Sequence, residues 1–197
     1  MSTIIYRIYH LISFLYCLIF GLKVNSKSII RFPVSIKGGK YIQLGKNVFI
    51  GKNARLFSYS CGEKHGSILI GNDFNAQRNL TISSLGEGHI KIGDNVLIGS
   101  DVLIIDNDHV ITPPLCAPVS LEKEKQPFKF GVIEIGSNVW IAEKAVILRN
   151  VKIGDYCIIG AGSVVTKDIP SYSIAVGNPA KIIKKWNFQT EKWEKIR

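Results

Sequence analysis

The sequence has few cysteines, and those it has are far apart. The 4 cysteines of the 197-residue chain are Cys17, Cys61, Cys116 and Cys157. No CxxC pair is present, and no cluster of His, Asp or Cys has the spacing of metal ligands. A disulfide framework is not expected in a chain of this length. We therefore predict no metal, and a reducing, cytoplasmic setting for the bulk of the chain.

A long uninterrupted apolar run is also missing. The most apolar stretch, residues 4–22, carries Arg7 and His10 in its first half, which leaves an uninterrupted run of 12 residues from Leu11 to Leu22. A helix that spans a bilayer needs about 20 such residues. No cleavage site of the A-x-A type follows, so a secretory signal peptide is not predicted.

Residues 1–30 are instead assigned to an apolar N-terminal helix whose role the sequence leaves open. One interpretation places the helix on the inner face of a membrane, at its periphery, helped by Lys23, Lys27 and Arg31. Another makes it a cap on the open end of the main domain. A true membrane anchor is a third interpretation, which the short apolar run disfavours.

Acidic residues are outnumbered by basic ones. The chain has 15 Asp and Glu against 25 Lys and Arg, a net charge of +10. This excess suits nucleic acid, an anionic membrane or a phosphorylated ligand. The basic residues are not grouped with aromatic platforms as in a nucleic-acid-binding module, so no nucleic acid is predicted. A hydrophobic content of 46% with 20% charged residues excludes wholesale disorder.

The chain does contain a clear period of six. Residues that open hexads are Leu44, Ile50, Leu56, Ile70, Ala76, Ile82, Ile92, Ile98, Ile104, Ile135, Ile141, Ile147, Ile153, Ile159 and Val165. Neither an α-helix, with a period of 3.6, nor a simple strand, with a period of 2, produces this pattern. It is typical of a parallel β-helix, in which three short strands form a coil of about 18 residues. We predict a mainly β domain of roughly seven coils over residues 31–185.

The period slips at two Gly-containing connections and is lost after Ile104. The slips fall at residues 61–67 and 83–89, and the loss begins a loop that we place at residues 106–131. A connection of this length inside a regular domain is usually functional or disordered. After the domain, residues 186–197 form a basic tail, for which we predict a short helix packed on the domain.

Residues 138–183 resemble the hexapeptide-repeat acyltransferases. The segments IGAGSVVTKDIP and VGNPAK carry the resemblance, which includes galactoside and maltose O-acetyltransferases and acetyltransferases of capsule and O-antigen clusters. It implies a left-handed parallel β-helix, acetyl-CoA as the donor, and a homotrimer with its active sites between subunits.

The resemblance also implies a catalytic base at His109, where the loop opens. A sugar hydroxyl is a weak nucleophile, and an imidazole can take its proton as it attacks a thioester. Asp106 and Asp108 flank the histidine, and either one could orient the imidazole, as the acid of a triad does.

Further roles carried over from the family concern the two substrates. The positions that match contacts with the donor are Ala142, Glu143, Ala161 and Thr166 for the pantetheine arm, and Lys167, Lys181 and Lys184 for the phosphates. A backbone amide near Ala142 is the expected donor to the oxyanion of the thioester. On the acceptor side, Asn79 matches a region that supplies a polar contact, and Trp140 is expected to line the cleft. The chain has Ala142 where the family commonly has glycine, and lysines where it often has arginines.

The sequence therefore predicts an acetyl-CoA-dependent O-acetyltransferase that acts on a sugar or polysaccharide building block. An alternative with the same fold is an N-acetyltransferase of an amino sugar, or an enzyme that modifies an antibiotic. A non-catalytic β-helix that serves as a binding scaffold is the alternative from another class.

Overall fold

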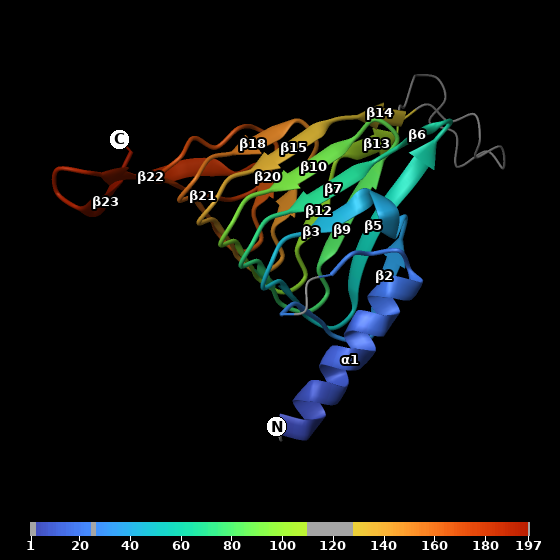
Figure 1. The fold of residues 1–197 in the computed structure, drawn as a ribbon. Coiled ribbons are helices and arrows are strands. Elements are labelled where there is room, and N and C mark those ends of the chain that lie inside the picture. Colours follow the sequence, from blue (N-terminus) through green and yellow to red (C-terminus); the bar gives the residue numbers. More distant parts are fainter. Residues whose placement is uncertain (1–2, 25–26, 110–127, 197) are drawn as a thin grey trace.

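The computed structural model describes residues 3–24, 27–109 and 128–196, and in these the chain forms a three-faced parallel β-helix preceded by one helix (Figure 1). Along the chain, each coil passes from face 1 to face 2 to face 3. Face 1 consists of β3 (Ile42–Leu44), β7 (Ser67–Ile70), β10 (His89–Ile92), β15 (Val132–Ile135) and β18 (Val151–Ile153). Face 2 begins with β1 (Ile29–Ile30), β4 (Phe49–Ile50), β8 (Asn75–Ala76), β11 (Leu97–Ile98), β16 (Trp140–Ile141), β19 (Ile158–Ile159) and β21 (Ser173–Val176). Face 3 consists of β2 (Val34–Lys37), β5 (Ala54–Cys61), β9 (Thr81–Leu85), β12 (Leu103–Ile105), β17 (Val146–Ile147) and β20 (Val164–Val165).

The hexad-opening residues form the core, which confirms the predicted β-helix. On face 2, Ile98, Ile141 and Ile159 lie in parallel register in successive coils, and each is 0% exposed. Adjacent strands in such a stack lie about 4.8 Å apart, so each inward side chain packs on its equivalents in the coils above and below. Five coils have a strand on all three faces, and an incomplete coil lies at each end.

The sites where the period slips or is lost all lie at one edge of the prism. This is the edge where the chain passes from face 3 to face 1, called here the 3–1 edge. Here β5 continues into a hairpin with β6 (Lys64–His65), and β13 (Asn107–His109) pairs with β14 (Phe128–Phe130) in a second hairpin. Gly86 turns the chain between the two hairpins, with the ring of Phe130 and the Cβ of Cys61 close against it. The inserted residues leave the stack at this edge, so the coils on either side keep their register.

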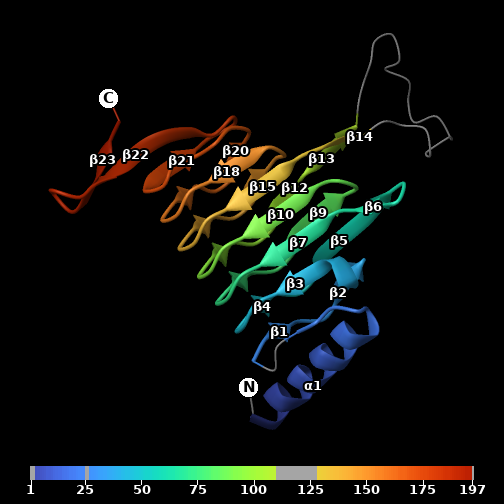
Figure 2. The ribbon, with the colours of Figure 1, turned by 45° about the horizontal axis from the view of Figure 1, so that its top comes forward.

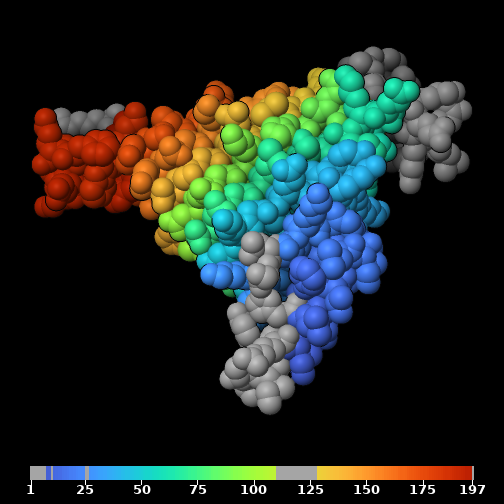
Figure 3. Space-filling model, viewed as in Figure 1, coloured from blue at the N-terminus to red at the C-terminus, as the bar shows by residue number. Residues whose placement is uncertain are grey.

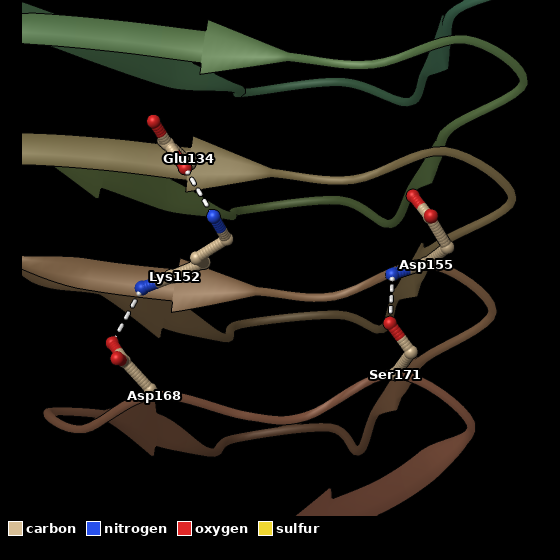
Figure 4. A network of polar contacts seen from close by, with 5 residues as sticks. All are labelled: Glu134, Lys152, Asp155, Asp168 and Ser171. Carbon is tan, nitrogen blue, oxygen red and sulfur yellow. Dashed lines mark hydrogen bonds and ion pairs between the residues drawn. The ribbon is translucent and has the colours of Figure 1, made fainter.

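Polar side chains connect successive coils on the outside of face 1 and at its edges (Figure 4). The carboxylate of Asp168 accepts from the backbone N–H of Lys152 at 2.8 Å, and Ser171 Oγ accepts from the N–H of Asp155 at 3.0 Å. Lys152 Nζ also pairs with Glu134 at 2.9 Å, and this contact lowers the pKa of the exposed Glu134 carboxyl. The contacts of Asp168 and Ser171 satisfy backbone N–H groups at places where the parallel ladder is interrupted.

The predicted helix in the C-terminal tail is wrong. Residues 181–195 form β22 (Lys181–Asn187) and β23 (Lys192–Lys195), which extend face 2 as antiparallel strands. An open strand edge at β21 offers unpaired backbone groups, and β22 satisfies them by pairing with it. Trp186 and Trp193 face each other across the hairpin with ring centroids 5.4 Å apart, a cross-strand pair that favours two strands over one helix.

The N-terminal helix, α1 (Thr3–Ile19), lies across the first coil, beside β1 (Figure 2). Ser13 Oγ donates to the carbonyl of Ile30, and Tyr16 Oη donates to the carbonyl of Val34 at 2.7 Å. Cys17 is fully buried in the core, and burial raises the pKa of its thiol to about 12. A short 3-10 helix, η1 (Gly39–Tyr41), packs against the end of α1, with no room for a Cβ between Gly39 and the carbonyl of Phe20. No helix in the described part of the chain is long and apolar enough to cross a membrane.

Candidate active site

His109 lies at the end of β13, on the hairpin that leaves the 3–1 edge. It pairs in antiparallel register with Phe128, and its ring centroid lies 4.7 Å from that of Phe128. The imidazole is exposed, whereas the hairpin that carries it is continuous with the packed strand β12 through Asp106. Of the predicted loop at residues 106–131, only the two strands and their junctions with the prism lie within the described residues. The geometry presents an exposed imidazole at the last described residue of β13.

Asp106 anchors the base of this hairpin. Its carboxylate is 0% exposed and accepts hydrogen bonds from Ser84 Oγ, from the backbone N–H of Leu85 at 3.2 Å and from Asn107 Nδ2 at 3.2 Å. Burial raises the pKa of the Asp106 carboxyl, against the opposing effect of these donors and of nearby His89. These contacts show that Asp106 holds the hairpin to β9; that it orients the imidazole of His109 stays a prediction.

Asp108 contacts the backbone of its neighbour. Asp108 Oδ1 accepts from the N–H of His109 at 2.8 Å, and both side chains are exposed. This hydrogen bond favours one backbone conformation at His109. It involves the backbone N–H and not the imidazole ring. A role for Asp108 in orienting the ring is therefore also still a prediction.

Three of the predicted donor contacts lie at a different edge, between faces 2 and 3, called here the 2–3 edge. Ala142 and Glu143 form its corner after β16, and Ala161 forms the next corner after β19. The N–H of Ala142 donates to the carbonyl of Ile159 at 2.9 Å, so this amide is already used by the parallel ladder. Within the described residues, the N–H groups of Glu143 and Ala161 have no acceptor, and both residues are exposed. An oxyanion donor near Ala142 stays a prediction, and of the two neighbouring amides the one that has no acceptor in the described part of the chain is that of Glu143.

Asn79 belongs to the same 2–3 edge, two coils nearer the N-terminus. It has a left-handed backbone conformation (φ 61°), and its side chain accepts from Asn53 Nδ2 at 3.1 Å and donates to Asp101 at 2.6 Å. These two hydrogen bonds use the carbonyl oxygen and one N–H of the Asn79 side chain. Asn79 also lines an open groove of about 700 Å³, together with Arg55, Thr81 and Asp101.

The remaining predicted site residues lie on face 2 or at the 3–1 edge. Trp140 is 48% exposed on face 2, two residues before Ala142. Lys181 begins β22 and pairs with Val176, whereas Lys184 lies further along the strand opposite Ile174. Thr166 and Lys167 are exposed at the 3–1 edge, directly after β20. The structure thus separates Lys167 from the other two predicted phosphate ligands.

The two edges are separated by the width of face 3. Glu143 and Arg149 stand on opposite sides of β17, and six extended residues span about 20 Å. Within one chain, His109 and the unpaired amides of Glu143 and Ala161 therefore lie on opposite sides of face 3.

Comparison with known proteins identifies the family of the chain. The family model described as "Bacterial transferase hexapeptide (six repeats)" matches residues 133–167, and the one described as "Hexapeptide repeat of succinyl-transferase" matches residues 89–105. The chain is 32% identical over 170 residues to WbbJ of Escherichia coli (strain K12), which is assigned to lipopolysaccharide biosynthesis as an O-acetyl transferase; the match covers 85% of this chain and 83% of that one. The chain belongs to the hexapeptide-repeat acyltransferase family.

Two galactoside acetyltransferases, one compared by sequence and one by structure, are also similar to the chain. The galactoside O-acetyltransferase of Escherichia coli (strain K12) is 39% identical over 143 residues, which are 70% of this chain but only 64% of that protein. A solved galactoside acetyltransferase in complex with coenzyme A is 28% identical, with a TM-score of 0.51 over 87% of this chain and 70% of that one. The chain is accordingly an acetyltransferase. The resemblance of residues 138–183 to this family is confirmed.

Sequence reasoning missed two polar pairs at and near the 3–1 edge of this acyltransferase. Ser84 and Asp106 are both fully buried and hydrogen-bonded to each other, and Ser67 Oγ is hydrogen-bonded to His89 Nδ1 on the outside of face 1. One signal was available in the sequence: Ser84 and Asp106 each stand two residues after a hexad-opening isoleucine, Ile82 and Ile104, where the period slips or is lost. Among the described residues, no group of three or more His, Cys, Asp or Glu is arranged to hold a metal ion.

We expect Asp106→Asn to change the pH dependence of stability of the acyltransferase. Because the folded pKa of Asp106 is raised, the folded chain binds a proton that the unfolded chain has already released. The contribution of this carboxyl to stability is therefore fully present below its ordinary pKa and is lost as the pH rises through the raised one. In Asp106→Asn the group cannot titrate, so wild type should lose stability relative to the variant as the pH increases.

Urea denaturation of both proteins at several values between pH 4.5 and pH 8 measures this difference. The free energy of unfolding of each protein is plotted against pH, and the two plots are subtracted. The subtraction removes the contribution of every other titrating group that the two proteins share. A difference that is constant, or that moves in favour of wild type with increasing pH, would contradict the raised pKa.

Proposed function

We propose that the enzyme transfers an acetyl group from acetyl-CoA to a hydroxyl of a sugar or polysaccharide building block. The observation that carries the proposal is His109, an exposed imidazole on a hairpin whose base is held by the buried Asp106. The names of the two relatives described above support O-acetylation and a saccharide acceptor. A basic side chain within reach of the acceptor hydroxyl is what direct transfer requires.

In the proposed reaction His109 acts first as base and then as acid. Its imidazole takes the proton of the acceptor hydroxyl while the oxygen attacks the thioester carbonyl carbon. The tetrahedral adduct collapses with cleavage of the C–S bond, and the imidazolium returns the proton to the departing thiolate. The products are the sugar acetate and coenzyme A, and no acyl-enzyme forms. An amide donor directed at the carbonyl oxygen would stabilise the negative charge that develops there.

The 2–3 edge fits the pantetheine part of the donor. Pantetheine carries amide carbonyls, and the unpaired N–H groups of Glu143 and Ala161 are suitable donors to them. Gly99 keeps this edge narrow, because a Cβ at that position would lie 2.6 Å from the nitrogen of Glu143. Lys181, close to the same edge, and Lys184 would supply positive charge for the phosphates, and Thr166 and Lys167 of the 3–1 edge would contribute from a neighbouring subunit.

A homotrimer with active sites between subunits would bring the two edges together. His109 projects from the 3–1 edge, and Glu143 lies across face 3 from it. Side-by-side packing of identical prisms can set the 3–1 edge of one protomer against the 2–3 edge of the next, and three such contacts close a ring. The division of the predicted residues between two edges is the structural support for this assembly. It also leaves Trp140 and Asn79 on the side that faces the incoming subunit.

A panel of acceptors tests the proposed reaction. Purified enzyme, acetyl-CoA and single sugars or nucleotide sugars are mixed, and release of the coenzyme A thiol is followed. We expect at least tenfold faster release with one hydroxyl acceptor than without acceptor. Its analogue without the reacting hydroxyl is the matched control and should show only the background rate.

The chemistry of the product separates the two acceptor classes. An acetate ester is cleaved by alkaline hydroxylamine, whereas an acetamide resists it. A hydroxylamine-stable product formed only from amino sugars would replace the proposed O-transfer by N-transfer. Release that no hydroxyl acceptor stimulates would contradict the proposal.

A further inference from the structure

The N-terminal helix carries an apolar stripe on the side away from the prism. Six exposed large side chains recur at intervals of three or four residues, namely Ile8, Leu11, Ile12, Leu15, Leu18 and Ile19, and the rings of Tyr9 and Phe14 are exposed beside them. Leu11 is 60% and Ile19 is 78% exposed. The prism contacts the other side of α1, through Ser13, Tyr16 and Cys17. A surface helix of a globular protein has the opposite arrangement, with its apolar stripe toward the core.

This stripe lies on an outer surface of the molecule. In Figure 3 the blue helix forms a ridge that projects from the end of the prism, next to the first coil. Large contiguous apolar patches on soluble proteins usually mark a binding surface. One side of α1 therefore packs against the prism, and the other side is exposed and can bind a partner.

The charge of the chain is concentrated at the same end. Residues 1–62, which make up α1 and the first two coils, contain nine Lys and Arg and not one Asp or Glu. Residues 63–197 contain 16 basic and 15 acidic residues, so nearly all of the net charge of +10 belongs to the N-terminal end. Lys23, Arg31 and Lys40 are exposed close to α1: Lys23 follows it, Arg31 follows β1, and Lys40 belongs to η1.

We propose that α1 and the basic first coils form a docking surface for a lipid bilayer that contains anionic lipids. An apolar helix face inserts at the boundary between headgroups and acyl chains, and flanking lysines and arginines are attracted by the negative surface. The hydrogen bonds from Ser13 and Tyr16 keep α1 on the prism, so the helix lies along the bilayer surface.

A second copy of the chain is a poorer partner for this end. Two N-terminal ends brought together would place nine basic residues opposite nine others, with no acidic residue in residues 1–62 to pair with them. Anionic headgroups supply the missing charge of opposite sign.

Vesicle sedimentation with the full-length chain tests the docking surface. Wild type should bind vesicles of phosphatidylglycerol and phosphatidylcholine at least tenfold more tightly than vesicles of phosphatidylcholine alone. The Leu11→Gln/Leu15→Gln/Ile19→Gln variant should lose binding at least tenfold, because it removes the apolar stripe without touching the buried side. Its thermal unfolding and its acetyl transfer to a soluble acceptor are expected to match wild type, which separates a docking defect from misfolding and from failure of the proposed reaction.

A pair of charge variants tests the electrostatic part. Each basic residue near an anionic surface contributes about a fivefold increase in binding, so Lys23→Gln/Arg31→Gln should lose about 25-fold. The matched control Lys91→Gln/Lys192→Gln removes the same charge from exposed positions on residues 63–197 and should bind like wild type.

Three results would overturn the proposal. The first is wild-type protein that fails to bind the anionic vesicles, and the second is equal loss in both charge variants. The third is a triple variant with unchanged vesicle binding but a smaller oligomer, which would assign the stripe to contact between subunits.

Discussion

His109→Ala is expected to lower kcat for acetyl transfer by about 10²–10⁴-fold, the range that a positioned general base contributes. The side chain is exposed at the end of β13, so its loss should change the free energy of unfolding by less than about 0.5 kcal/mol. Affinity for coenzyme A should also be retained, because the proposed donor contacts lie at the 2–3 edge. Steady-state kinetics, thermal unfolding and calorimetric titration with coenzyme A measure the three quantities.

The matched control for this variant is Lys129→Ala on the partner strand. Lys129 lies opposite Asp108 in the same hairpin and differs from His109 in having no role in the proposed proton transfer. It should keep a kcat close to that of wild type, which shows that truncating a side chain on this hairpin is tolerated. If His109→Ala retains more than a tenth of the wild-type kcat, the histidine is not the base.

Ile90→Ala is expected to destabilise the protein by about 2–5 kcal/mol, the cost of a large-to-small change in a packed core. Ile90 is 0% exposed and lies in register between Ile68 and Ile133 of the neighbouring coils. Removing its side chain leaves a void in a stack that has no other layer to close it. Urea denaturation followed by circular dichroism measures the change.

Lys91→Ala, at the next position of the same strand, is the control. Lys91 points outward between Leu69 and Glu134, and its truncation should cost less than about 0.5 kcal/mol. Equal effects at the two positions would contradict the alternation of inward and outward side chains on which the coil depends.

The core could be predicted because it depends on a local repeat. Each of Ile98, Ile141 and Ile159 opens a hexad. Three hexads make one coil, so Ile141 and Ile159, which are 18 residues apart, stack, and Ile98 keeps the register because the inserted loop leaves the prism. His109 could be found for the related reason that it opens the segment where this repeat is lost. Both inferences needed only neighbouring residues in the chain.

The C-terminal hairpin could not be predicted in this way. Residues 181–186 alternate between exposed and half-buried because β22 lies against β21, and β23 in turn lies against β22. An apolar pattern with two tryptophans is compatible with a helix until the open edge of face 2 is known to need a partner. Pairing with that edge satisfies backbone groups that no local pattern reveals.

The buried carboxylate shows the same limit at the candidate site. Asp106 and Asp108 look equivalent beside His109 in the sequence, but Asp106 is enclosed by Ser84 and Leu85, which come from the preceding coil. Burial of one acid and exposure of the other depends on how two coils stack at the 3–1 edge. No spacing within residues 106–109 contains that information.

The sequence by itself determined the coil, the position of its break and the family, because a six-residue period and two short segments are properties of the chain read in order. Only the tertiary structure decided that the unpaired amides of Glu143 and Ala161 lie at a different edge of the prism from His109, and that α1 turns its apolar stripe outward above a basic end. The physical reason is that edge, burial and exposure are defined between segments far apart in the chain, and stacking of the coils sets them.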